Sequence, residues 1–157
     1  MVQFTDKAPY IKQIVLYFQS KNYQKAYELS KEFIEEYPEQ MPAHFLYAKA
    51  AFWLNDYELA RKEAQIAFNL SKGQDELTVT GILLACALYR LKEYESGMEL
   101  LKLLKSKIAS QEKVMKLKFI FALALNDEHA ALRHLDELYE MNEAEAKALM
   151  LKLVSSN

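Results

Sequence analysis

The residues of this chain that could do chemistry are few and scattered: three histidines, one cysteine and the acidic side chains. Catalysis needs a nucleophile, a base and an orienting group brought together, and a metal site needs ligands at suitable spacing. His129 and His134 are five positions apart, which points them to different helix faces and does not make the i, i+4 pair of a metal site. The chain has no His-Glu-x-x-His, no Cys-x-x-Cys and no glycine-rich loop. We therefore expect no enzyme activity, no cofactor and no metal site.

The remaining histidine and the cysteine lie where packing roles are expected. His44 occupies the place that Tyr10 holds 34 positions earlier, at the predicted junction of two helices. Cys86 lies inside the apolar run 82–88, and burial in such surroundings raises the pKa of a thiol and makes it unreactive. The alternatives, a functional histidine and a reactive thiol, stay open. A single cysteine cannot form an internal disulfide, so nothing indicates an oxidising compartment.

Composition narrows the classes further. The 157 residues suffice for one domain with its own core, and 52% of them are apolar. Three glycines and three prolines are too few for the turns of a β-sandwich or barrel. A formal charge of −2 argues against a nucleic-acid binder. The start lacks a signal-peptide pattern, and the longest apolar runs are shorter than the roughly 18 residues of a membrane span. We expect a cytoplasmic, mostly helical protein that does not insert into membranes.

The chain contains an internal repeat. Residues 23, 57, 94 and 128 lie at equivalent places, with spacings of 34, 37 and 34, and the first three of them are tyrosines. Each follows a polar turn and precedes a small residue three positions later. Apolar residues on both sides of the turns recur at helical spacing. The pattern predicts helices at about 7–20, 23–36, 41–54, 57–70, 75–91, 94–108, 111–125 and 127–140, and a ninth at about 143–154.

The recurring residues are, unit by unit, Tyr10, Tyr17, Tyr23, Ala26, Phe33 and Pro38; Tyr47, Ala48, Tyr57, Ala60 and Ala67; Leu84, Ala85, Tyr94, Gly97 and Leu104; and Ala122, Ala131 and Leu138. This pattern resembles the tetratricopeptide repeat (TPR) family, whose unit is a 34-residue helix–turn–helix. The resemblance implies an all-α, right-handed superhelix of four TPR-like repeats plus a C-terminal capping helix. The repeats would span about 7–40, 41–74, 78–111 and 112–143 of a single domain, residues 1–157.

Small residues predict where the helices of a repeat touch, and the one longer spacing predicts where extra residues are inserted. Ala48 and Ala85 are expected to face Ala60 and Gly97 where the two helices of a unit touch. The longer spacing places three extra residues at 71–74, where Gly73 suits a positive φ. Ile14 and Phe119 replace the small residue in the first and fourth units, which leaves the register of the fourth unit open. The ninth helix either caps the stack or docks a second subunit.

The resemblance also implies a binding site, because such solenoids bind partners on the concave surface formed by the first helices of their units. The family members that hold acidic chaperone tails do so with Lys, Arg and Asn. Here those positions are Ile11, Val15, Leu46, Val79 and Leu83, so no such clamp is expected. An apolar partner peptide, with acidic residues meeting the flanking cations, is expected instead, with Trp53 and Tyr89 as anchors. The expected binding residues are Ile11, Val15, Phe18, Phe45, Lys49, Phe52, Trp53, Ile82, Cys86, Tyr89, Arg90, Lys116, Ile120 and Leu123.

These expectations describe a non-enzymatic protein-interaction module, an adaptor or a chaperone-like protein. Its size is similar to that of the small repeat-built chaperones of bacterial type III secretion. The alternative is a self-associating scaffold, a possible homo-oligomer, whose groove is partly filled by its own Val2 and Phe4. Charge is uneven, since residues 102–118 carry six lysines against Glu112 whereas residues 127–147 are strongly acidic. Neutralisation between neighbouring helices, a head-to-tail subunit contact and RNA binding by the lysines are the three explanations.

Overall fold

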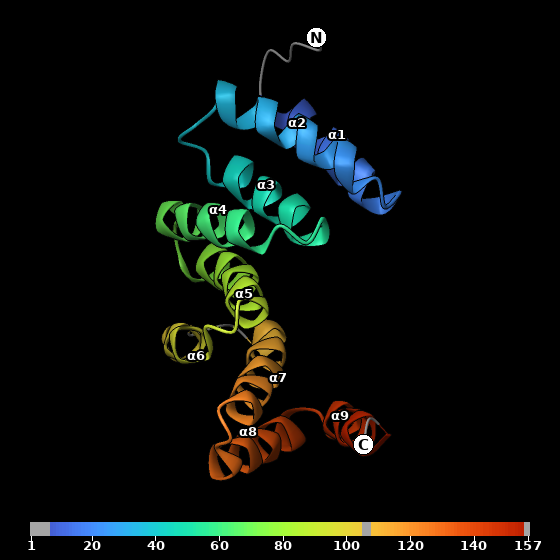
Figure 1. Cartoon of the computed structure of the whole chain (residues 1–157), viewed down its shortest axis with the longest axis vertical. Coiled ribbons are helices and arrows are strands. Elements are labelled where there is room, and N and C mark those ends of the chain that lie inside the picture. The colour runs from blue at the N-terminus through green and yellow to red at the C-terminus, as the bar shows by residue number, and fades with distance from the viewer. Residues whose placement is uncertain (1–6, 105–107, 156–157) are drawn as a thin grey trace.

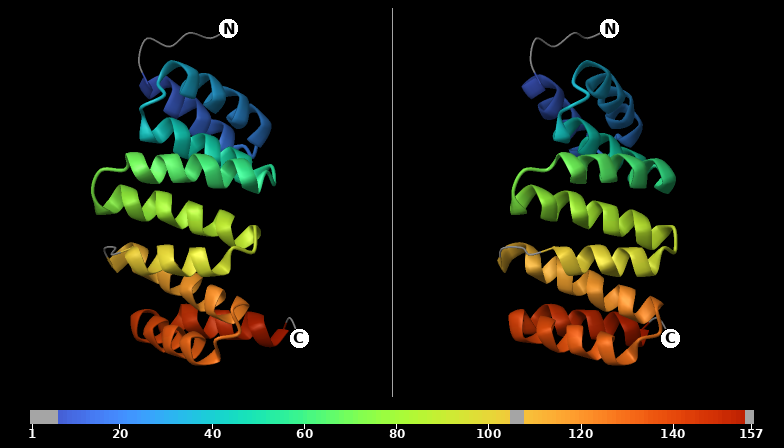
Figure 2. Two further views of the ribbon diagram at one scale, coloured as in Figure 1. Left: turned by 60° about the vertical axis from the view of Figure 1, so that its left-hand side comes forward. Right: turned by 90° about the vertical axis from the view of Figure 1, so that its left-hand side faces the viewer.

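The protein is a stack of α-helices that lie across one long axis. The computed structural model describes residues 7–104 and 108–155, and these residues form nine helices and no strand. The two ends of the chain lie at opposite ends of the stack (Figures 1 and 2). No helix in these ranges is long and apolar enough to cross a membrane. The helices are α1 (Lys7–Gln19), α2 (Tyr23–Glu36), α3 (Met41–Trp53), α4 (Tyr57–Leu70), α5 (Gln74–Arg90), α6 (Tyr94–Leu103), α7 (Ile108–Ala124), α8 (Glu128–Met141) and α9 (Glu143–Ser155).

The repeat is visible in the backbone of the turns. Lys21, Asn55, Lys92 and Asn126 have positive φ angles of 59°, 66°, 62° and 58°, and they are spaced as the repeat is. In each turn the next amide donates to the carbonyl five residues earlier, at 2.8 Å from Asn22 and 2.9 Å in the other three. This is the hydrogen bond of a Schellman motif, which ends one helix and redirects the chain into the next. The same turn therefore closes every helix pair.

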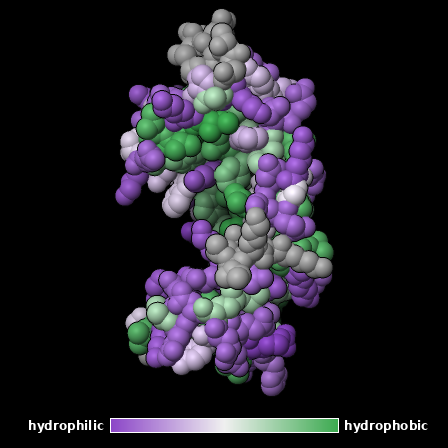
Figure 3. Space-filling model, turned by 180° about the vertical axis from the view of Figure 1, so that it is seen from behind, coloured by the Kyte–Doolittle hydropathy of each residue, from purple (hydrophilic) through white to green (hydrophobic). Residues whose placement is uncertain are grey.

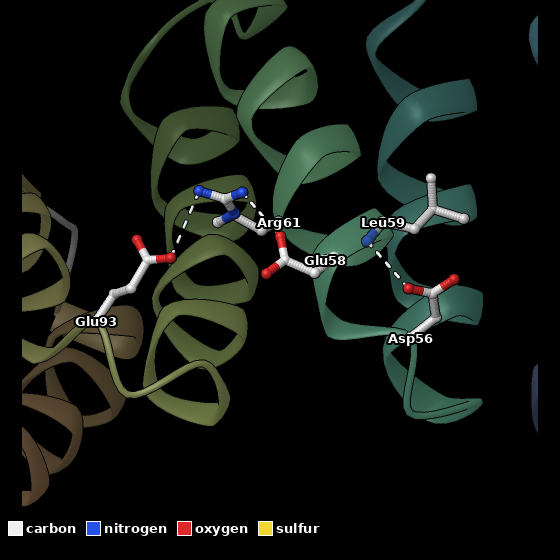
Figure 4. A network of polar contacts seen from close by, with 5 residues as sticks. All are labelled: Asp56, Glu58, Leu59, Arg61 and Glu93. Carbon is white, nitrogen blue, oxygen red and sulfur yellow. Dashed lines mark hydrogen bonds and ion pairs between the residues drawn. The ribbon is translucent and has the colours of Figure 1, made fainter.

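Three of the four turns also cap the following helix. The side chains of Asn22, Asp56 and Asp127 accept the amide three residues ahead, at 3.3, 3.2 and 3.0 Å. Such a cap typically contributes about 1 kcal/mol to helix stability. Glu93 makes no such bond. Its carboxylate instead lies 3.5 Å from Arg61 on α4, which also holds Glu58 at 2.8 Å (Figure 4). The third turn thus replaces a cap with a link between α4 and α6.

The small-residue contacts differ from the expectation. Ala60 clusters with Ala51 and Ala87, whereas Ala48 lies in the larger cluster that contains Ala64. In an antiparallel helix pair, residues equally distant from the turn lie opposite each other. Ala51 and Ala60 are equally distant from the turn at residues 55–56, and Ala48 is one helical turn farther away. The expected facing of Ala48 and Ala60 is therefore wrong by about one turn.

Gly97 is needed for a contact with the next repeat. A Cβ atom at this position would lie well inside van der Waals distance of the Phe121 ring on α7. Phe121 is fully buried, and its ring also contacts Tyr89 and Tyr94 edge-on at 5.5 and 6.3 Å. Gly97 thus admits an aromatic ring between α5, α6 and α7. Gly73 has a positive φ of 86°, as expected, and directly precedes α5.

Helix boundaries agree with the sequence except between the third and fourth pairs. The sixth helix is predicted to continue to 108, but α6 ends at Leu103, and residues 105–107 lie outside the described residues. Leu104 leaves the helix and is buried, with its Cδ2 atom 2.7 Å from where a Cβ on Gly81 would stand. Burial of this side chain against α5 accounts for the early end. α7 begins at Ile108, three residues before the predicted start.

His44 is a buried polar link within the first half of the stack. Its Nδ1 lies 2.6 Å from Oε2 of Glu63 on α4, and its Nε2 lies 2.7 Å from the carbonyl oxygen of Pro38. Both side chains are at most 10% exposed. Because a carbonyl only accepts, Nε2 donates its hydrogen to Pro38, and Nδ1 faces the carboxyl group of Glu63. The pair joins α3 to α4 and to the preceding loop.

Candidate functional site

The helices α1, α3, α5 and α7 lie side by side on one side of the stack, which we call the inner side. Each helix packs on its neighbours in sequence, and α1, α3, α5 and α7 also contact one another in succession. Two cavities of about 400 and 450 Å³ lie on this side and share Phe45 and Val79. The first is lined by Ile11, Met41, Pro42, Phe45, Leu46, Asp75, Glu76 and Val79. The second is lined by Phe45, Lys49, Phe52, Trp53, Val79, Ile82, Leu83, Cys86 and Lys113.

We call these joined cavities the α3–α5 groove, because most of their lining comes from those two helices. The residues appear in the same order along both, so α3 and α5 run parallel beside the groove. From Met41 to Trp53 the wall rises by about 18 Å at 1.5 Å per residue. A hollow of hydrophobic surface lies over the N-terminal half of the molecule in Figure 3. The groove is therefore an apolar channel as long as a short helix.

Local sequence explains why these side chains share one face. On α3 the lining residues follow i, i+3, i+4, i+7, i+10 and i+11 from Pro42, and on α5 they follow i, i+3, i+4 and i+7 from Val79. This spacing aligns side chains along one side of a helix. The same spacing is visible in the sequence. It could have added Pro42, Leu46, Val79 and Leu83, which the sequence-based set of binding residues lacks.

Seven of the fourteen predicted residues line the α3–α5 groove: Ile11, Phe45, Lys49, Phe52, Trp53, Ile82 and Cys86. Trp53 is the most exposed of them, at 52%. Its indole ring stacks on Tyr23 at 5.3 Å with an interplanar angle of 10°, and Phe52 meets it edge-on at 6.1 Å. The indole ring is therefore held by two aromatic neighbours while about half of the residue stays exposed.

The other predicted residues have different surroundings. Tyr89 packs against the core and contacts Tyr94 and Phe121, so it belongs mainly to the repeat junction. Ile120 also packs against the core. Val15 and Leu123 are exposed. Phe18 is half-buried beneath Lys49, whose Nζ lies 4.8 Å from its ring centre.

The predicted cations are in unequal states. Arg90 lies over the rings of Tyr57 and Phe52, at 5.3 and 6.0 Å. Lys116 is held by Glu145 of α9 at 2.6 Å and by Glu112 at 3.5 Å. The hydrogen bond that Lys116 donates to Glu145 raises the pKa of Lys116 and lowers the pKa of Glu145. The charge of Lys116 is thus neutralised within the fold.

The one thiol of the groove is not activated. Burial raises the pKa of Cys86, and the charge of Arg90 opposes this only in part. The Cys86 side chain is half-buried and lines the groove together with Ile82. A protonated thiol is a small apolar group with little nucleophilicity. Within the described residues, no group of three or more His, Cys, Asp or Glu side chains could hold a metal ion.

A larger cavity of about 610 Å³ lies on the outer side, between α4 and α6. Its apolar floor consists of Leu84, Leu88 and Leu100, all of which are buried. Its rim is polar, and the Arg61–Glu93 ion pair connects its two sides (Figure 4). The α3–α5 groove, by contrast, leaves Trp53 and Val79 about half exposed. We therefore regard the α3–α5 groove as the candidate site.

Known structures share this architecture. The chain is similar to the TPR2B domain of yeast Sti1, solved in a complex with pHsp70, with a TM-score of 0.54 and 19% identity over 88% of this chain and 99% of that chain. It is also similar to YrrB, described as a TPR protein with an unusual peptide-binding site, with a TM-score of 0.57 and 13% identity over 94% of this chain and 92% of that chain. No family model and no curated protein matches the sequence. With nine stacked helices in its described residues, the chain has the tetratricopeptide-repeat fold.

Proposed function

We propose that this protein is a non-enzymatic interaction module, an adaptor or chaperone-like protein that binds a partner peptide or helix in the α3–α5 groove. The observation that carries the proposal is a continuous apolar groove in which Trp53 and Val79 stay about half exposed. Contiguous exposed apolar surface on a protein usually marks an interaction site. Burial of one aromatic or aliphatic anchor contributes about 1.5–3 kcal/mol, so several anchors together can hold a short segment.

The structural neighbours support the same class of function. Both are TPR proteins, one solved with pHsp70 and the other described by its peptide-binding site. In this chain, Leu46, Val79 and Leu83 stand in the groove where a carboxylate clamp would need polar side chains. An apolar partner suits such walls better than the free carboxylate of a peptide terminus.

Self-association is a second candidate, favoured by apolar surface at the C-terminal end of the stack. Leu132 on α8 and Leu151 on α9 are 60% and 69% exposed, and Met150 is also exposed. In this alternative, copies of the chain contact one another through α8 and α9. The expectation that Val2 and Phe4 fill the groove concerns residues outside the described part of the chain.

Partner capture with matched variants tests the leading proposal. Trp53→Ala combined with Val79→Asp removes two exposed groove side chains, and Leu132→Asp makes a similar change on α8. We expect the double variant to lose captured partner while its helical signal stays unchanged, and Leu132→Asp to retain the partner. Equal capture by the double variant and the wild type would refute the groove as the site.

Solution mass tests the alternative. If the protein self-associates through its C-terminal end, its mass rises with concentration and returns to the monomer value in a Met150→Lys, Leu151→Lys variant. A wild-type monomer over the whole concentration range would exclude this alternative.

A further inference from the structure

We infer that the occupant of the α3–α5 groove is an amphipathic helix of another protein, about three turns long, with an acidic side chain facing Lys49 and Lys113. This inference rests on the proposed function and names the class of partner. Three features of the groove carry it: its length, the chemistry of its walls and the placement of its charges.

The length of the groove matches a short helix. The lining residues of α3 extend from Met41 to Trp53, which corresponds to about 18 Å at 1.5 Å per residue. A helix of about 12 residues laid along the groove covers the same distance, because its rise is identical. Three turns of an amphipathic helix supply four or so apolar side chains on one face.

The walls offer few hydrogen-bond partners to the backbone of an extended peptide. Apart from Asp75, Glu76, Lys49 and Lys113, the lining of both cavities is apolar. The backbone amides and carbonyls of α3 and α5 are bonded within those helices. An extended peptide would bury most of its own amides and carbonyls in the groove without partners, and each unpaired group is costly. A helix satisfies these groups internally and presents only side chains, as in other helix-in-groove complexes.

Two cations that line the second cavity, one from α3 and one from α7, indicate the charge of the partner. Lys49 and Lys113 both line the second cavity. Among the described residues, neither forms an ion pair, and Lys49 only lies over the Phe18 ring. An acidic side chain of the partner over this cavity would be attracted by both ammonium groups in partly apolar surroundings, where the attraction is stronger than in water.

Helix dipoles do not account for these two lysines. Asp75 in the first turn of α5 and Arg90 in its last turn complement the dipole of that helix. Lys49 precedes the last turn of α3, and Lys113 lies in the second turn of α7, so both are outside the terminal turns in which a helix dipole acts. The feature that the two lysines share is that they line the second cavity of the groove.

The experiment is selection from a displayed library of random peptides of about 16 residues, long enough to form a helix. The full-length wild type, Lys49→Glu with Lys113→Glu, Val79→Asp, and the control Lys62→Glu on the outer surface of α4 serve as baits. We expect the wild type to enrich peptides with apolar residues at i, i+3, i+4 and i+7 and an acidic residue at one position. The charge-reversed variant should enrich a basic residue at that position, and Lys62→Glu should behave as the wild type.

The strongest peptide is then measured in solution. We expect it to gain helical signal in far-UV circular dichroism on binding. A proline in its middle, on the side away from the groove, should lower affinity at least about tenfold. The double reversal of Lys49 and Lys113 should lower affinity by a similar factor at low salt and less at high salt.

The outcomes separate this inference from the proposed function. Peptides that depend on Val79 but gain no helicity, or whose acidic preference survives the reversal of Lys49 and Lys113, overturn the inference and leave the proposed function standing. Selection that is unaffected by Val79→Asp, or that enriches no peptide, overturns both. Enrichment only after residues 1–6 are deleted identifies the chain's own N-terminus as the occupant and also overturns the inference.

Discussion

The inner side of the stack has two regions that differ in how their charges are used. Over α3 and α5 it is a largely apolar groove, and Lys49 and Lys113, which line its second cavity, lack an acidic partner among the described residues. On α7 another lysine, Lys116, is held by Glu112 and by Glu145 of α9. Asn142, between α8 and α9, also donates to Glu112 at 3.1 Å. The first region leaves its two lysines without an ion pair, whereas α9 supplies the acidic partner in the second.

This difference bears on the uneven charge of the chain. The lysine-rich segment 102–118 and the acidic segment 127–147 meet in the ion pair of Lys116 and Glu145. That contact supports the explanation in which neighbouring helices neutralise each other. It also assigns α9 to the stack, because its residues complete the surroundings of α7. The surface that we propose for interaction therefore lies in the first half of the inner side.

The largest expected effect on stability concerns the buried contact between His44 and Glu63 in the first half of the stack. His44→Leu leaves Glu63 buried without its partner, so we expect the free energy of unfolding to fall by about 3–5 kcal/mol in urea denaturation. His44→Leu combined with Glu63→Leu removes both polar groups and should recover part of the loss. A loss below about 1 kcal/mol in the single variant would show that this contact does not stabilise the first half.

A smaller effect is expected at the junction that separates the two regions. Gly97→Ala places a methyl group against the Phe121 ring, and overpacking of this kind costs about 1–3 kcal/mol. Part of this cost is offset, because alanine favours a helix over glycine by about 1 kcal/mol. Ser96→Ala, at the neighbouring exposed position on α6, serves as the control and should change little. Combining Gly97→Ala with Phe121→Leu should restore stability, and failure to do so would place the strain elsewhere.

The smallest effect on stability is expected at the ion pair of Lys116 and Glu145 in the second region. Because Lys116 lowers the pKa of Glu145 below the ordinary value of 4.5, the pair stabilises the fold above that value. The contribution is lost as the pH falls through the lowered pKa. Glu145→Gln should therefore be less stable than the wild type at neutral pH and equal to it in acid. Glu140→Gln, an exposed change on α8, controls for the charge. A difference that persists in acid would contradict the ion pair as its source.

Much of the fold was predictable because it rests on local signals. The turn residues recur at fixed spacing, and the apolar stripes of α3 and α5 follow helical periodicity, so the helices and half of the groove residues follow from the sequence. The residues whose positions differ from the sequence-based prediction depend on contacts between segments that are far apart in the sequence. Leu104 leaves α6 to reach Gly81, and Tyr89 turns to the ring of Phe121. The state of Lys116 depends on where α9 lies, which no spacing in the sequence specifies.

The most direct test uses the single tryptophan of the chain, which lies in the α3–α5 groove. The measurement is acrylamide quenching of Trp53 fluorescence, with and without a saturating amount of the strongest selected peptide. Because Trp53 is about half exposed, we predict efficient quenching in the free protein, and a several-fold smaller quenching constant with an emission shift to shorter wavelength in the complex. Unchanged quenching at saturation would place the bound peptide elsewhere and contradict the assignment of the groove.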